Sequence, residues 1–259
     1  MPHIYSFLAL VVGLAAVAVS GPSFAQKAQG YVLEVSGNVT GQVGSGQPAK
    51  VEKGQTLVNN ATITTSPQSY AVLKFEDGTA VLLKENTSFQ VQNYAYNPKV
   101  PENASAVFNL VRGGMRLLTG LVTSRNRDAL KVATPLATMG IRGTEFVVVL
   151  VNPLYLQVLS GTVSATNAAG TVAYTAGQAA VVTNSTTLPS LIPMNQVPSG
   201  VFLMPNYPLT SVPATIPAGA PVGGAAAGGG GIAAAIAIGA IGVAGVISAG
   251  GSQQTAVQH

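Results

Sequence analysis

The side chains that could do acid–base or nucleophilic chemistry are few in this sequence of 259 residues. Glu76 and Asp77 are the only adjacent carboxylates, and paired-carboxylate catalysis would need a partner from elsewhere in the chain. Both histidines lie at the extremes, as His3 and His259, so a hydroxyl such as that of Ser160 has no histidine base. A serine–lysine pair stays open but has no sequence signature. We therefore expect no catalytic residues and a protein that is not an enzyme.

Residues that could bind a metal or a cofactor are equally scarce. The absence of cysteine excludes disulfides and thiolate metal sites. With one histidine at each end of the chain, multi-histidine metal sites are excluded too. None of the Gly-rich stretches carries the lysine of a phosphate-binding loop before a helix. The sequence predicts no metal and no cofactor.

The residues that stand out instead belong to a turn with a central arginine. Gly140 and Gly143 flank Arg142, and Thr144 and Glu145 lead into an apolar run over residues 146–151. Because glycine adopts backbone conformations that other residues reach only at a cost, this segment is typical of a constrained turn before a buried strand. We expect the Arg142 guanidinium to lock the turn, either by pairing with Glu145 or by bonding backbone carbonyls. Contact between Arg142 and a ligand is the alternative.

A second structural motif is the pair Asp77-Gly78, which lies between alternating runs at 70–75 and 79–84. An Asp-Gly pair in this setting is a strong hairpin signal. We expect the Asp77 carboxylate to accept hydrogen bonds from nearby backbone N–H groups.

Five of the twelve basic residues form the only basic cluster, which could attract nucleic acid, anionic lipid or an acidic partner. The interpretation we favour is a solvated rim of a β-domain, because no nucleic-acid-binding motif accompanies the cluster. Its members are Arg112, Arg116, Arg125, Arg127 and Lys131.

These residues must be positioned by β-strands. Residues 31–183 consist of short alternating apolar runs separated by turn residues. Among them, runs at 107–111 and 115–118 flank a predicted turn at Arg112, Gly113 and Gly114, and three further runs follow Glu145. About a dozen strands and no amphipathic helix indicate an all-β domain over residues 26–187. A sandwich, a barrel and a solenoid-like stack are all compatible with this pattern.

The N-terminal segment is typical of a secretory signal peptide over residues 1–25. An apolar run at 4–19 is followed by Gly21-Pro22 and by small residues before Gln26, where we expect cleavage. An uncleaved anchor is the alternative, although the run is short for a membrane span. We expect export to the periplasm, to the outer membrane or to the medium.

The C-terminal part carries no charged residue after Glu145. Residues 188–231 are rich in Pro and then Gly, which predicts an extended linker. The tail at 232–259 begins with an uncharged run at 232–249, long enough for a marginal membrane span or for self-association through small residues. A low-complexity tail is the other interpretation.

The order of these motifs resembles the FecR-domain family, extracytoplasmic modules best known from bacterial iron-transport signalling. The resemblance covers approximately residues 35–182. It implies an all-β periplasmic module, sandwich-like or solenoid-like, without a cofactor. Regulators of this kind begin with a cytoplasmic segment that binds a sigma factor, whereas only a short leader precedes the domain here. The residues that carry the resemblance include Asp77, Gly78, Gly113, Arg116, Gly140, Arg142, Gly143, Thr144 and Glu145.

Two functions follow as expectations. The first is a non-enzymatic binding and assembly module of the envelope or secreted fraction, with a protein or glycan as partner. In this function residues 232–249 would contact a membrane or other copies. The alternative is an accessory in envelope signal transduction through a separate transmembrane regulator.

Overall fold

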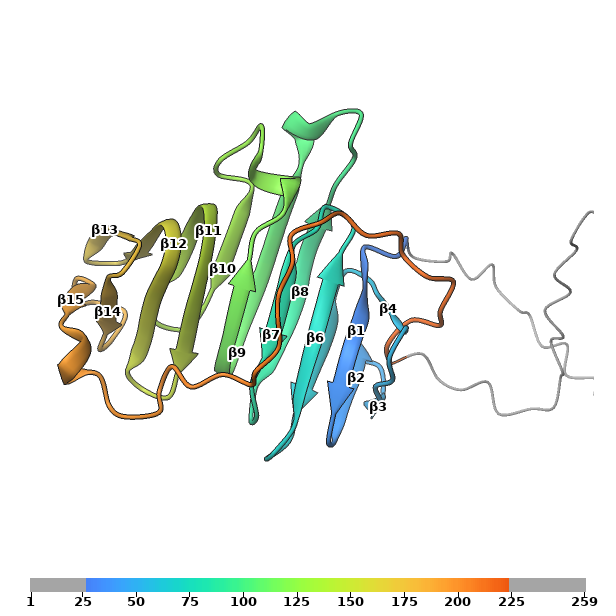
Figure 1. Ribbon diagram of the computed structural model, residues 1–259, viewed down its shortest axis with the longest axis horizontal. Coiled ribbons are helices and arrows are strands. Elements are labelled where there is room, and N and C mark those ends of the chain that lie inside the picture. The colour runs from blue at the N-terminus through green and yellow to red at the C-terminus, as the bar shows by residue number, and fades with distance from the viewer. Residues whose placement is uncertain (1–26, 224–259) are drawn as a thin grey trace, which may run out of the picture. The chain divides into compact units, whose positions relative to one another are not determined.

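Fifteen β-strands run through residues 27–223, the part of the chain that the computed structural model describes (Figure 1). They confirm the predicted all-β class. The predicted leader and apolar tail lie outside the described residues. Helical structure within residues 27–223 is limited to three short 3-10 turns: η1 (Pro101–Asn103), η2 (Leu121–Thr123) and η3 (Met194–Gln196). No helix in this part of the chain is long and apolar enough to cross a membrane.

The strands form two stacked layers that are parts of one folded-over sheet (Figure 1). Three long strands contribute a half to each layer: β9 (Ser105–Leu118), β11 (Thr138–Leu150) and β12 (Leu154–Asn167). The first layer also contains β4 (Thr56–Leu57), β1 (Gly30–Ser36), β6 (Tyr70–Phe75), β7 (Ala80–Leu83), β14 (Ala179–Val182) and β15 (Ser190–Ile192). The second layer also contains β3 (Ala49–Lys50), β2 (Val39–Val43), β5 (Ala61–Thr65), β8 (Ser88–Ala95), β10 (Leu130–Ala133) and β13 (Gly170–Thr175).

Each long strand changes partners where it bends from one layer into the other. In β9, residues 105–112 pair with β8, residues 115–118 pair with β7 and residues 113–118 pair with β11. The sequence predicts a turn that separates two strands here, but the strand continues through Gly113, whose φ of 84° allows the bend. The bend in β12 uses Gly161 in the same way, with φ of 75°. A Cβ on Gly161 would lie 2.3 Å from the Gly143 carbonyl oxygen, so only glycine fits.

The core lies between the two layers. It is formed because buried and more exposed side chains alternate along the strands. In β5, for example, Ala61, Ile63 and Thr65 are buried, whereas the residues between them are partly exposed. Its centre is a group of aromatic rings. The ring centroid of Phe75, in the first layer, lies 5.0 Å from that of Tyr94 and 4.9 Å from that of Phe108, both in the second layer. These ring contacts therefore join the two layers.

The outer face of the first layer is covered by an extended segment, residues 193–222, which we call the strap (Figure 1, orange). Under it, side chains that alternate away from the core are nonetheless buried, among them Val72, Leu82 and Val149. The Lys74 ammonium donates hydrogen bonds to the carbonyl oxygens of Gly78 and Thr210, the second of which belongs to the strap. The strap therefore shields an apolar sheet face.

The strap ends by adding to the edge of the first layer at β4. The Thr56 N–H donates to the Ala220 carbonyl at 2.9 Å, and the Val222 N–H donates to the Thr56 carbonyl at 3.0 Å. The Val222 side chain is fully buried in the core. The segment expected to be a linker is thus extended, but as far as residue 222 it packs on the β-domain and includes strand β15 at the opposite edge.

Candidate functional site

Asp77 and Gly78 form the turn between β6 and β7, as the sequence predicts. The Gly78 N–H donates to the Phe75 carbonyl at 3.0 Å, and the Phe75 N–H donates to the Thr79 carbonyl at 2.9 Å. Gly78 has a φ of 95°, the left-handed conformation that such a turn needs. The hairpin prediction is confirmed.

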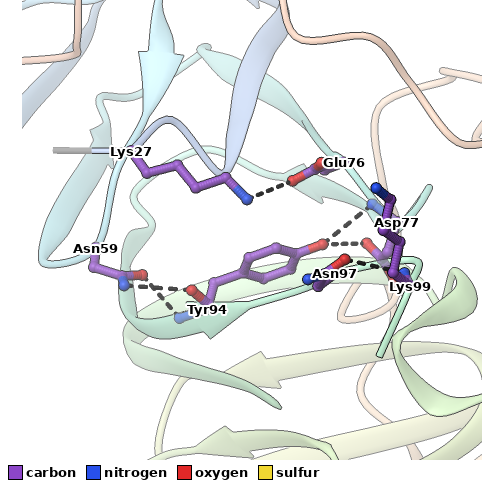
Figure 2. Close-up of polar contacts among 7 residues, drawn as sticks. All are labelled: Lys27, Asn59, Glu76, Asp77, Tyr94, Asn97 and Lys99. Atoms are coloured by element: carbon purple, nitrogen blue, oxygen red, sulfur yellow. Dashed lines mark hydrogen bonds and ion pairs between the residues drawn. The ribbon is translucent and has the colours of Figure 1, made fainter. Parts of the chain in front are cut away.

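The Asp77 carboxylate is completely buried and accepts four hydrogen bonds. Oδ1 accepts from the Tyr94 hydroxyl at 2.7 Å and from the Thr79 N–H at 3.0 Å. Oδ2 accepts from the Thr79 hydroxyl at 2.7 Å and from the Val122 N–H at 2.9 Å. Figure 2 shows the Tyr94 ring pointing at the carboxylate. A buried charge is tolerable here because both oxygens are saturated with donors.

Asp77 thereby joins three segments that are distant in sequence: its own turn, strand β8 through Tyr94, and the loop after β9 that contains η2. The Asp77 backbone takes part as well, since its carbonyl accepts from the Leu121 N–H at 2.9 Å. Burial, followed by the negative charge of Asp77, raises the pKa of the Tyr94 hydroxyl well above its ordinary value, so Tyr94 stays a donor. With no open access to the carboxylate, this centre holds the fold together and does not offer a reactive group.

Sequence reasoning did not identify Tyr94 as a member of this centre. Tyr94 lies in an alternating run, where an aromatic residue is expected to be ordinary core, and it is 17 positions from Asp77. Around the centre, the exposed Lys27 ammonium lies 3.3 Å from a Glu76 carboxylate oxygen, and the Asn59 side chain bonds both the N–H and the carbonyl of Tyr94 (Figure 2).

Arg116 and Glu145 form a separate, half-buried ion pair across β9 and β11. The Arg116 Nε lies 2.7 Å from the Glu145 Oε1, and Nη2 contacts the same oxygen. Their side chains retain 29% and 21% exposure. The pair spans the outer side of the first layer, just past the bend of β11.

Arg142 is not paired with Glu145, and this expectation is wrong. Its side chain is 58% exposed, and Nη2 lies 3.2 Å from the Asp128 carboxylate. The reason is the bend at Gly143, where φ is 58°: Arg142 pairs in register with Thr162 of the second layer, and Glu145 belongs to the first. None of the hydrogen bonds within residues 27–223 joins the Arg142 side chain to a backbone carbonyl.

The remaining motif residues lie at or near the bends. Gly113 lies against Thr87, whose Cα would be 2.5 Å from a Cβ at that position, and Gly140 lies close to the Ser164 hydroxyl. The buried Thr144 exchanges hydrogen bonds with Thr119, donating from its N–H at 2.9 Å and accepting at its carbonyl at 3.0 Å. The motif residues therefore divide into a buried centre, an ion pair and a set of bends; they do not form one site.

Neither a metal-binding cluster nor a serine–lysine hydrogen bond occurs among the described residues. Residues 27–223 contain no group of three or more His, Asp or Glu residues that could hold a metal ion. No hydrogen bond between a serine hydroxyl and a lysine amine occurs in the same range.

Comparison with known proteins supports the resemblance over part of the chain. Residues 61–164 match the family model described as "FecR protein", which confirms the resemblance carried by the motifs. Two crystal structures of a "putative anti-sigma factor" from Parabacteroides distasonis ATCC 8503, at 2.50 and 1.65 Å resolution, are similar to this chain, with TM-scores of 0.41 and 0.40 and identities of 14% and 16%. Each comparison covers 51% of this chain and 58% of the other, so the chain spans just over half the length of these proteins. No curated protein matches the sequence.

Proposed function

We propose, from the premise that residues 61–164 form a FecR domain, that this protein is a non-enzymatic component of envelope signal transduction. It would act by contact with another protein, a separate transmembrane regulator. The domain match is the observation that carries the proposal, because the resemblance associates such domains with signalling across the bacterial envelope. Signalling is therefore the stronger of the two expected functions.

The chemistry of the described residues agrees with a role by contact. The one fully buried carboxylate that the motifs mark, Asp77, is saturated by Tyr94, Thr79 and Val122 and holds the two layers together. Such a centre stabilises a rigid scaffold, which suits a module that presents a surface to a partner. Export is part of the proposal and is supported by the leader-like residues 1–25.

The test is a chromosomal deletion followed by transcript sequencing, with complementation by the full chain and by a chain that lacks residues 1–25. We expect a discrete set of genes to change and the full chain to restore it. The chain without the leader should be made but fail to restore the pattern. Unchanged transcription in the deletion strain, under iron limitation as well as iron sufficiency, would refute the signalling role.

The assembly function depends on residues 232–249, which lie outside the described residues, and it stays a prediction. Its test compares membrane retention of the intact chain with that of a chain truncated after Gly223. Truncation earlier would confuse the result, because Val222 is part of the core. If both chains are extracted equally well by high salt, the tail is no anchor.

A further inference from the structure

We infer that a pocket beside the bend of β11 binds a phosphate group. The pocket has a volume of 580 Å³ and lies between the loop that follows β9 and the corner where β11 and β12 bend. Its polar lining comes from Thr123, Ser124, Arg127, Arg142 and Thr162, with the Gly143 backbone at the corner. This inference does not depend on the proposed signalling function.

Positive charge is the first feature that indicates an anion. Two guanidinium groups, of Arg127 and Arg142, line the pocket, and no acidic residue does. Arg127 has no ion-pair partner within residues 27–223. Among the described residues, Arg142 pairs only with Asp128. Because these side chains are 58% and 75% exposed, the pair is weak and can open for a competing anion.

Unused hydroxyl groups are the second, independent feature. Thr123 is only 7% exposed, yet its hydroxyl has no hydrogen-bond partner in the described chain, and the residue lines the pocket. A hydroxyl that lines a pocket without a partner in the described chain is free to donate a hydrogen bond to a ligand there. The Ser124 and Thr162 hydroxyls on the same pocket likewise make no hydrogen bond within residues 27–223.

The geometry of the donors favours phosphate among the common anions. Arginine matches phosphate oxygens with its planar fork of N–H groups. Hydroxyl donors arrive from two segments, η2 and β12, so the donors converge on the pocket from different directions, as a tetrahedral group requires. A phosphate group could come from a soluble phosphate or from a phospholipid headgroup, and the test must separate these sources.

The test uses the full chain, titrated with inorganic phosphate at pH 7 and constant ionic strength, with binding measured by calorimetry. We expect saturable binding that Arg127→Gln and Arg142→Gln each weaken by about tenfold or more. Thr123→Val, which keeps the shape and removes the hydroxyl, should also weaken it. Arg112→Gln removes the same charge from an exposed residue that does not line the pocket, and it should leave the affinity unchanged.

Vesicles of phosphatidylglycerol, with phosphatidylcholine vesicles as control, form the second arm. Vesicle binding that needs Arg127 and Arg142 and that free phosphate displaces would assign the ligand to a lipid headgroup. Phosphate binding without vesicle binding would assign it to a soluble phosphate. The inference is overturned if neither probe binds, or if Arg112→Gln weakens binding as much as the pocket variants do.

Discussion

The Tyr94 hydroxyl lies 2.7 Å from the Asp77 Oδ1, so a side chain of the second layer is bonded to a buried carboxylate in a turn of the first. Phe75, the neighbour of that turn, stacks on the same Tyr94 ring. The contact joins the layers by a charge-assisted hydrogen bond and by packing at one point.

Replacing Tyr94 with Phe should test the hydrogen bond while keeping the ring. We expect Tyr94→Phe to lower the free energy of unfolding by about 1.5–3 kcal/mol, because the buried carboxylate loses a donor. Chemical denaturation measures this. Tyr96→Phe is the matched control, since Tyr96 is also buried but its hydroxyl makes no hydrogen bond within residues 27–223. Equal losses in the two variants would contradict the role of the Tyr94–Asp77 contact.

The same contact predicts a pH dependence at alkaline pH. The pKa of Tyr94 is raised in the folded protein, first by burial and then by Asp77, above the ordinary value of 10.0. The folded state therefore holds the proton more tightly than the unfolded state, and this stabilisation is complete below pH 10.0 and is lost as pH rises beyond it. Unfolding free energies measured from pH 8 to 11 should fall less steeply above pH 10 in Tyr94→Phe than in the wild type. Parallel curves would show that Tyr94 does not titrate differently in the two states.

The bend of β12 predicts a steric requirement at Gly161. A Cβ there would lie 2.3 Å from the Gly143 carbonyl oxygen, and φ is 75°. Gly161→Ala should therefore destabilise the protein by more than the roughly 1 kcal/mol expected for a strained backbone alone. Gly177→Ala isolates the backbone component, because Gly177 has a φ of 83° with no atom within 4 Å of its Cβ position. If the two variants unfold at the same urea concentration, the bends at Gly161 and Gly143 are not in tight steric contact.

The docking of the strap at Val222 predicts local release without global unfolding. Val222→Asp places a charge in the core, so the end of the strap should detach from β4. Limited proteolysis should then cut within residues 193–222, while circular dichroism still reports the β-domain. Val212→Asp makes the same change on the strap at a residue that is 67% exposed, and it should stay resistant. Equal cleavage of both variants and the wild type would show that Val222 does not hold the strap.

Local patterns predicted the fold class and the Asp77-Gly78 turn because both depend on residues close in sequence. The predicted Arg142–Glu145 pair was wrong because a bend at Gly143 places the two residues in different layers. Likewise, β9 continues through Gly113 where composition indicates a turn, because the pairing partner on each side is decided by strands far away in sequence.

The strap could not have been predicted from its composition. Proline removes backbone donors and disfavours strands in the middle of a sheet, which indicates a linker. Its packing depends instead on carbonyl groups, such as those that accept from Lys74 and Thr56, and on the burial of apolar side chains such as Val222. Every residue has a backbone carbonyl, so contacts made by carbonyl groups cannot be recognised from the residue types in the sequence.

The return of the strap to β4 also decides how the domain would respond to force. The Gln29 N–H bonds the Leu57 carbonyl, and the Thr56 N–H bonds the Ala220 carbonyl, so both ends of the described chain are fastened to the same two-residue strand. Tension between those ends would load the few bonds of β4 one after another, as in peeling, and would not shear the long strands β9, β11 and β12. At the N-terminal end the Glu76 N–H also bonds the Gln29 carbonyl, so the next pairing to take up the load would be that of β1 with β6.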